Sequence, residues 1–184
     1  MTTTVFTPAP AATWTLDPAH SSVEFAVRHL MIATVRGRFS DVRGTVSAPE
    51  HDFGAGSVDV TVGAASIDTR EPQRDAHLKS ADFFDVERFP SIVFRSTRIR
   101  AAGAGRFEVH GSLTIHGVTR DILLDVTSEG VTRDPWGAER AGFSATTTIR
   151  RSDFGLTWNQ LLEAGGVAVG DDVKLSIDAE LVKS

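Results

Sequence analysis

The sequence predicts an all-β fold, a single extended antiparallel β-barrel of about eight strands with one or two short helices at its ends. In the segment 107–116, apolar residues or glycine alternate with polar residues, which is the pattern of a strand with one dry face. The same alternation recurs over 23–28, 58–62, 141–149 and 172–181. Many one-faced strands with little helix must curl around their apolar faces, because an open sheet would leave those faces in water.

The elements follow one another as in an antiparallel meander, with glycine-rich or aspartate-rich breaks between strands. A short helix is expected over 71–81, because Pro72 stands near its start, where proline is well tolerated. Residues 158–166 are expected to form a short helix or helical turn that ends at the glycine pair 165–166. Strands are expected at 14–17, 21–29, 37–47, 57–68, 91–99, 106–116, 120–129, 140–149 and 172–182.

The length of 184 residues fits one domain, which we expect to span 14–184 after a loose N-terminal leader of residues 1–13. A formal charge of −5 with scattered arginines argues against a nucleic-acid partner. The absence of cysteine excludes a thiolate nucleophile and cysteine-ligated metals. The chain shows neither a signal peptide nor the roughly 18 consecutive apolar residues of a membrane span, so we expect a cytoplasmic protein.

The polar residues that could carry chemistry have simpler structural interpretations. His110 and His116 lie on one expected strand about 20 Å apart, too far to share a metal ion, and the other histidine spacings match no zinc motif. Asp17, His20 and the serines at 21–22 are close in sequence, but catalytic triads are assembled from distant segments, and this one is typical of a turn. We expect no catalytic residue, metal or cofactor.

His29 shares the predicted inward register of Val23, Phe25 and Val27. An imidazole in a dry interior must find a hydrogen-bond partner, so His29 is either a satisfied core histidine or a residue that contacts a ligand. The interior itself is ambiguous. Eleven phenylalanines, three tryptophans and no tyrosine suit a hydrocarbon-rich ligand, and they suit a solid core equally well.

Five motifs in order, from Trp14 to Lys183, carry a resemblance to a known family: WTLDPAHSSVEFAVRHLMIATVRGRFSDVRGTV, SIDTREPQRDAHLKSADFFDVERFPSIVFRST, GSLTIHGVTR, RAGFSATTTIRRSDFGLTWN and GDDVKLSIDAELVK. Together they resemble the YceI family of polyisoprenoid-binding proteins. The resemblance implies a lipocalin-like barrel with a long hydrophobic tunnel that holds an isoprenoid chain, such as a polyprenyl quinone. The function it implies is lipid sequestration, storage or transport without a catalytic step. It also allows a homodimer.

Strand parity within the matched motifs assigns lipid contact to inward residues on four predicted strands. Phe154 and Trp158 are expected to line or close one end of the tunnel. Two alternatives stay open: an enzyme that acts on an isoprenoid, with His29 as the visible polar candidate, or a solid barrel that serves as a stress-response interaction module. The residues assigned to the tunnel wall are Val23, Phe25, Val27, His29, Val109, Leu113, Ile115, Phe143, Ala145, Leu175 and Ile177.

Overall fold

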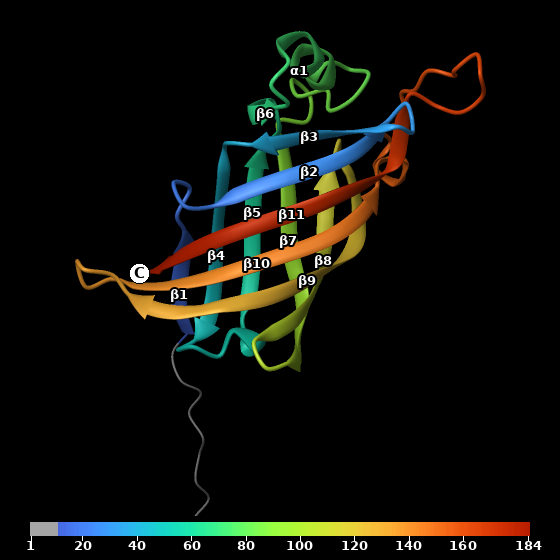
Figure 1. Cartoon of the computed structure of the whole chain (residues 1–184). Helices are drawn as coiled ribbons and strands as arrows, with labels where there is room; N and C mark the ends of the chain where they lie inside the picture. Colours follow the sequence, from blue (N-terminus) through green and yellow to red (C-terminus); the bar gives the residue numbers. More distant parts are fainter. Residues whose placement is uncertain (1–10) are drawn as a thin grey trace, which may run out of the picture.

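The computed structural model describes residues 11–184, which form an antiparallel sheet of eleven strands with one α-helix (Figure 1). The strand order is β1-β4-β5-β7-β8-β9-β10-β11-β2-β3-β6, and β1 also pairs with β11, which closes eight strands into a barrel. The predicted fold class is therefore confirmed. The strands are β1 (Ala11–Leu16), β2 (Ser22–His29), β3 (Ala33–Phe39), β4 (Val42–Pro49), β5 (Ser57–Gly63), β6 (Ile67–Asp68), β7 (Ser91–Gly103), β8 (Arg106–Ile115), β9 (Val118–Arg133), β10 (Glu139–Arg150) and β11 (Val169–Lys183).

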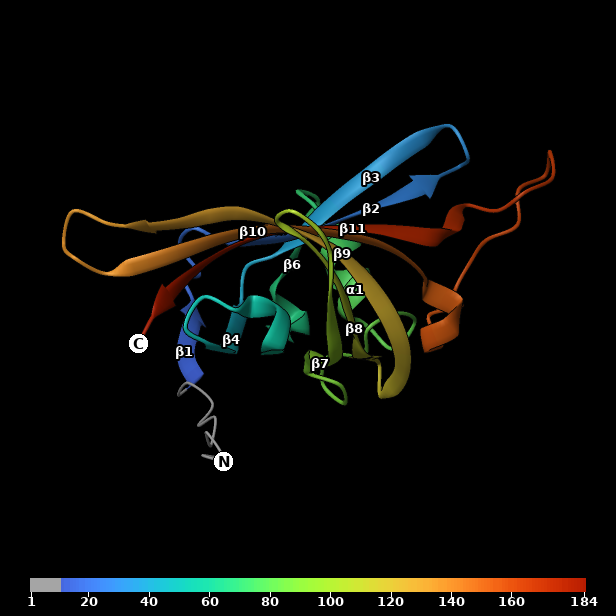
Figure 2. The ribbon, with the colours of Figure 1, turned by 90° about the horizontal axis from the view of Figure 1, so that it is seen from below.

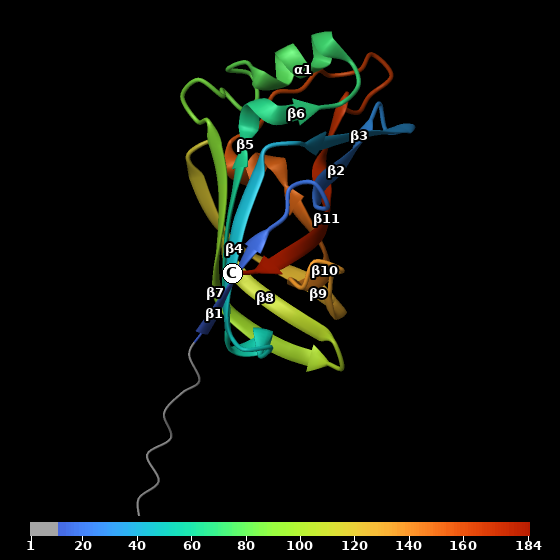
Figure 3. The ribbon, with the colours of Figure 1, turned by 90° about the vertical axis from the view of Figure 1, so that its left-hand side faces the viewer.

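The barrel has two walls whose strands cross at a steep angle (Figures 1 and 3). One wall holds β1, β4, β5, β7 and β8, and the other holds β9, β10 and β11, with β2 as its continuation. The apolar core between them contains two clusters. One centres on Trp14, Phe39 and Phe53, and the other on Phe94, Leu113 and Phe154.

The long strand β11 divides its outer edge between two partners. Its C-terminal end pairs with β1, where Leu181 lies opposite Leu16, and its middle pairs with β2, where Asp178 lies opposite Ser22. Strands β1 and β2 therefore lie end to end along β11. Beyond this junction, β2, β3 and β6 continue the sheet outside the closed barrel.

The predicted helix over 71–81 is confirmed as α1 (Pro72–Lys79), which lies over one end of the barrel (Figure 3). The Glu71 carboxylate accepts hydrogen bonds from the backbone N–H groups of Gln73 and Arg74, and so caps two donors that the first turn leaves free. Pro72 occupies the first helical position, where its missing N–H costs nothing.

The helix or helical turn predicted over 158–166 is wrong. This segment is a loop, in which Leu161 and Val167 form an isolated β-bridge around a turn with positive φ at Gly165 and Gly166. The Asn159 side chain binds both the N–H and the C=O of Val169, so the backbone polar groups find partners across the loop instead of along a helix.

Two predicted strands are each broken in the structure. The segment 37–47 bends at 40–41 between β3 and β4, and the segment 57–68 is interrupted by a short 3₁₀ helix, η2 (Ala64–Ser66), before β6. Phe39 and Val42 show the first break. They are three residues apart and would face opposite sides of a continuous strand, but both line the interior.

The expected leader of residues 1–13 overlaps the first strand, since β1 begins at Ala11 and Ala11 to Thr13 pair with β4. The rest of that leader lies outside the described residues. Two further 3₁₀ helices, η1 (Phe53–Ala55) and η3 (Arg151–Phe154), flank the two ends of the barrel. Within residues 11–184, no helix is long and apolar enough to cross a membrane.

Candidate functional site

An apolar cavity of about 290 Å³ lies inside the barrel and is lined by side chains from both walls. This volume is close to the lower end of small-molecule sites, roughly 300 Å³. Among its lining residues, Thr45 and Arg151 carry the only polar side chains. Nine of the eleven phenylalanines line it: Phe25, Phe39, Phe53, Phe83, Phe84, Phe94, Phe107, Phe143 and Phe154.

Strand alternation aims these side chains at the cavity. On β8, Val109 and Leu113 line it, and the inward position between them is Gly111. A Cβ at Gly111 would stand 2.4 Å from the Phe94 ring, so the glycine makes room for that ring. Gly37 on β3 does the same for the ring of Phe25, which would lie 2.3 Å from an added Cβ. Both glycines therefore shape the apolar interior.

Aromatic side chains cover both ends of the cavity. At the α1 end, Trp158 stacks edge-on against His77, with ring centroids 4.8 Å apart, and lies 5.3 Å from Phe83. At the opposite end, Phe53 lies 5.4 Å from Trp14 and 4.9 Å from Phe143. Aromatic rings thus lie at both ends of the cavity, which has little hydrogen-bonding capacity.

Arg151 is a buried cation on the cavity wall. Its guanidinium donates hydrogen bonds to the backbone carbonyls of Leu156 (2.6 Å), Trp158 (2.9 Å), Gly170 (2.8 Å) and Val169 (3.3 Å). Burial lowers the pKa of Arg151 from its usual value, and the group forms no ion pair within residues 11–184. Its donors clamp the segment 156–170 against the end of the barrel.

The chain matches the sequence profile of the YceI-like domain over residues 14–181. It belongs to the YceI-like family. A UPF0312 protein of Staphylococcus aureus is 39% identical over 168 residues, covering 91% of this chain and 95% of that protein. A UPF0312 protein of Vibrio cholerae is 39% identical over 150 residues, covering 80% of this chain and 79% of that protein.

Several solved structures share the fold. The YceI protein of Campylobacter jejuni superimposes with a TM-score of 0.74 at 32% identity, over 85% of this chain and 90% of that one. BcnA of Burkholderia cenocepacia gives 0.77 at 25% identity, over 90% and 98%. A polyisoprenoid binding domain from Saccharophagus degradans gives 0.72 at 16% identity, over 93% and 98%, which shows the fold alone.

Eleven of the thirteen residues predicted to contact a lipid line the cavity, and their contact with a lipid stays a prediction. His29 does not line it: the side chain is exposed at the end of the β2–β3 hairpin, beyond the closed barrel. Trp158 lines no part of the cavity either, but it covers Phe83, which does. The eleven lining residues are Val23, Phe25, Val27, Val109, Leu113, Ile115, Phe143, Ala145, Phe154, Leu175 and Ile177.

Sequence reasoning missed two groups of lining residues. One group follows the same period of two on strands that received no site assignment: Val42 and Val46, Val58 to Val62, Ile92 and Phe94, and Ile122 to Val126. The alternation in these segments could have identified them. The other group, Leu78, Phe83 and Phe84, comes from α1 and the turns after it, where no strand parity applies.

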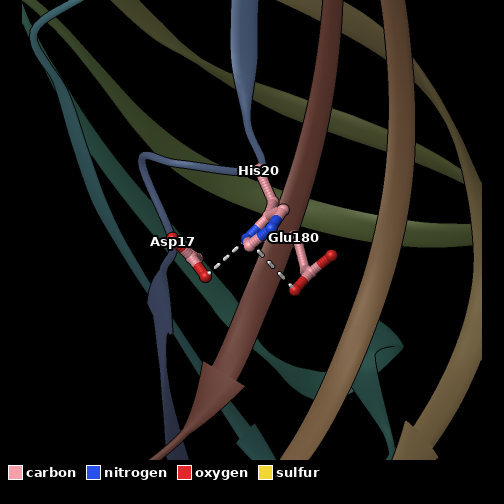
Figure 4. A group of neighbouring side chains, drawn as sticks. All are labelled: Asp17, His20 and Glu180. Atoms are coloured by element: carbon pink, nitrogen blue, oxygen red, sulfur yellow. Dashed lines mark hydrogen bonds and ion pairs between the residues drawn. The ribbon is translucent and has the colours of Figure 1, made fainter. Parts of the chain in front are cut away.

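Asp17, His20 and Glu180 meet outside the cavity, where the β1–β2 turn touches β11 (Figure 4). His20 Nδ1 lies 2.9 Å from Asp17 and 3.8 Å from Glu180. The Arg140 guanidinium already bridges both carboxylates, at 2.9 Å and 2.5 Å, so the cluster has its own counter-cation. The neighbouring Ser21 hydroxyl binds the Glu180 backbone, so Ser21 and this cluster tie the turn to the barrel.

Hydrogen bonds from His20 and Arg140 lower the pKa of Asp17 to about 2. The hydrogen bond to Asp17 raises the pKa of His20. Both shifts favour the charged pair, so the contact between the β1–β2 turn and the barrel depends on pH.

Proposed function

We propose that this protein binds an isoprenoid lipid, such as a polyprenyl quinone, in the barrel cavity and acts as a store or carrier for it. The observation that carries the proposal is the apolar cavity that spans both core clusters and is walled by branched aliphatic and phenylalanine side chains. The name of the fold relative from Saccharophagus degradans, a polyisoprenoid binding domain, supports this class of ligand.

The chemistry of the wall suits a ligand that is nearly all hydrocarbon. Each CH₂-sized group moved from water into an apolar site contributes about 0.8 kcal/mol, so a prenyl chain gains affinity without a specific polar contact. A sugar or nucleotide would leave its hydroxyl or phosphate groups unpaired among phenylalanines, which is costly.

Binding without catalysis is the simpler function for this wall. Arg151, the charged residue of the cavity wall, donates four hydrogen bonds to backbone carbonyls. His29, the residue expected to serve a catalytic alternative, is exposed outside the cavity. Neither group stands ready to move a proton within the lipid site.

The test is mass spectrometry of an organic extract from protein purified without detergent. It is run beside Ala145→Phe, which adds a ring at a buried lining position of β10, and beside Thr146→Phe, which adds the same ring at the next, exposed position. We expect stoichiometric isoprenoid in wild type and Thr146→Phe, and a several-fold loss in a folded Ala145→Phe protein, because the new ring takes up part of the cavity.

A filled barrel gives a different pattern. Ala145→Phe would then be destabilised by overpacking, by about 1–3 kcal/mol, and no lipid would be extracted from any variant even after incubation with prenyl quinones. That outcome would overturn the proposal and favour the interaction-module alternative. Turnover of the bound lipid by the purified protein would favour the enzyme alternative.

A further inference from the structure

Two loop tips at one corner of the molecule carry most of the large apolar side chains that are exposed within residues 11–184. The tip of the β2–β3 hairpin carries Met31, 55% exposed, and Ile32, 80% exposed, next to Leu30. The neighbouring loop 159–168 carries Leu161, 84% exposed. Both tips project to the same side of the barrel in two perpendicular views (Figures 1 and 2). Four of the seven exposed large apolar residues within 11–184 thus gather at these two tips.

The hairpin turn holds its apolar residues in a conformation that they rarely adopt. Leu30 and Met31 have φ of 49° and 60°, the left-handed region in which hairpin turns normally place asparagine or glycine. A polar turn would be less strained and better solvated in water. The Arg28 guanidinium braces the turn by donating to the Met31 carbonyl at 2.7 Å. The fold therefore holds large apolar side chains outward at a position where turn chemistry favours small polar ones.

The tips are joined to each other and to the cavity wall. The Leu30 N–H donates to the Ala168 carbonyl at 2.8 Å, and His29 pairs with Val169 in the β2–β11 ladder. Val169 lines the cavity, and so does Val27, two residues before His29. The exposed apolar patch thus continues directly into the wall of the proposed lipid site.

The charge around the hairpin tip favours an anionic partner. Residues 25–40 contain Arg28, Arg36 and Arg38 and no acidic residue, in a chain whose formal charge is −5. Arg38 pairs with Asp68, whereas Arg28 and Arg36 make no ion pair within the described residues. Glu163 is the single acidic residue between 157 and 170, and the next ones, Asp171 and Asp172, lie in β11, farther from the tips. Exposed aliphatic tips beside basic residues are the features with which proteins insert into anionic lipid surfaces.

We propose that the tips of the β2–β3 hairpin and of the loop 159–168, through Met31, Ile32 and Leu161, dock on an anionic lipid bilayer at the cavity end where a lipid is loaded. This rests on the proposed function. A second copy of the chain fits the surface less well, because a stable interface needs roughly 800 Å² per partner and two narrow tips offer little flat area. The arginines on the hairpin would also repel their copies.

The first test is flotation with vesicles of phosphatidylcholine, with and without phosphatidylglycerol. The variant Met31→Ser/Ile32→Ser/Leu161→Ser removes the apolar tips. Its control is Trp136→Ser, which removes a side chain that is 86% exposed on the β9–β10 hairpin at the opposite side. We expect wild type and Trp136→Ser to float with the anionic vesicles, more weakly in high salt, and the triple variant to bind about tenfold less.

The second test separates docking from lipid binding. Geranylgeraniol is offered either from anionic vesicles or as a solution without vesicles. We expect the triple variant to load several-fold more slowly from vesicles and as well as wild type from solution. Equal flotation and equal loading from vesicles would overturn the docking proposal and leave the cavity function intact. Flotation by the tips with no loading from either source would overturn the cavity function alone. Concentration-dependent dimerisation that the triple variant abolishes, without flotation, would assign the tips to a second copy.

Discussion

Strands β8 and β2 face the same cavity but are held in different ways. Strand β8 is hydrogen-bonded to β7 and β9 along nearly all of its length, and its inward residues Val109, Leu113 and Ile115 are buried. Strand β2 is also paired along both edges, with β11 and with β3, but the far edge of β3 pairs only at Arg38 and Phe39, with β6, and the inward residues of β2 are half-buried. Strand β8 is therefore the more firmly held side of the cavity, and β2, at the edge of the closed barrel, is the less firmly held side.

A long lipid chain enters a cavity with aromatic rings at both ends most easily where the wall can move apart. The free energy of opening is smallest where few apolar contacts are lost and backbone hydrogen bonds are exposed, and the β2–β3 side has both properties. The same side carries the apolar tips proposed to meet a membrane. Substitutions matched between the two walls can test whether this contrast governs stability and loading.

The largest expected effect comes from removing one phenylalanine ring beside β8 and, for comparison, one on β2. Phe94, 7% exposed, lies on β7 beside β8 and packs in the second core cluster with Leu113, so Phe94→Ala should lower the free energy of unfolding by about 4 kcal/mol. Phe25 is half-buried, so Phe25→Ala should cost about half as much. Chemical denaturation of the lipid-free proteins measures both values. Equal losses would contradict the contrast between the walls.

A similar comparison uses the two glycines that accommodate rings. A Cβ at Gly111 would stand 2.5 Å from the Arg95 carbonyl oxygen, which the β-ladder holds in place, whereas at Gly37 the atoms closest to an added Cβ belong to the side chains of Phe25 and Thr69. Gly111→Ala should therefore destabilise the protein by about 3 kcal/mol, and Gly37→Ala by about 1 kcal/mol. Thermal unfolding of the two variants measures both losses. A larger loss in Gly37→Ala than in Gly111→Ala would show that the β2–β3 side is the more rigid one.

Arg151→Met tests the clamp on the loop that leads to the second tip. Losing the guanidinium leaves carbonyls such as that of Leu156 without their donor, which should cost about 2 kcal/mol. The segment 156–170 should then be cut faster by protease, while β8 stays protected. Thr157→Ser, at an exposed position of the same loop, serves as the control. Unchanged cleavage of the loop in Arg151→Met would contradict the clamp.

The smallest effect is the pH dependence of the junction between the β1–β2 turn and the barrel. The pKa of Asp17 is lowered from 3.8 to about 2, so its contribution to stability is present above pH 3.8 and is lost as the pH falls toward 2. The hydrogen bond to Asp17 raises the pKa of His20, so its contribution is fully present below the ordinary histidine pKa of 6.5 and is lost as the pH rises through the raised pKa.

Stability measured across pH in wild type and Asp17→Asn checks this dependence. Between pH 3.8 and about 2, the free energy of unfolding should fall less in Asp17→Asn than in wild type, because the variant has no carboxylate to protonate at this position. Amide exchange should rise in β2 before it rises in β8. If stability falls in the same way at acidic pH in both proteins, the loss comes from other carboxylates.

The sequence by itself determined the barrel and most of its inner surface. A side-chain period of two places Val109, Leu113 and Ile115 on one face wherever the strand lies, and the face that is apolar must be the dry one. The helix start at Glu71 and Pro72 was readable for the same reason, because caps depend on neighbours in the chain.

Tertiary structure decided what those local patterns could not. His29 keeps the inward parity of β2, yet it is exposed because the hairpin runs beyond the closed barrel, and strand length relative to partner strands is not a local property. The loop around Leu161 resembles a helix in sequence, but Asn159 and Arg151 supply its backbone groups with partners from elsewhere. The pairing of β1 with β11, which closes the barrel and creates the cavity, joins segments at opposite ends of the described chain, because hydrogen bonding between strands does not depend on sequence separation.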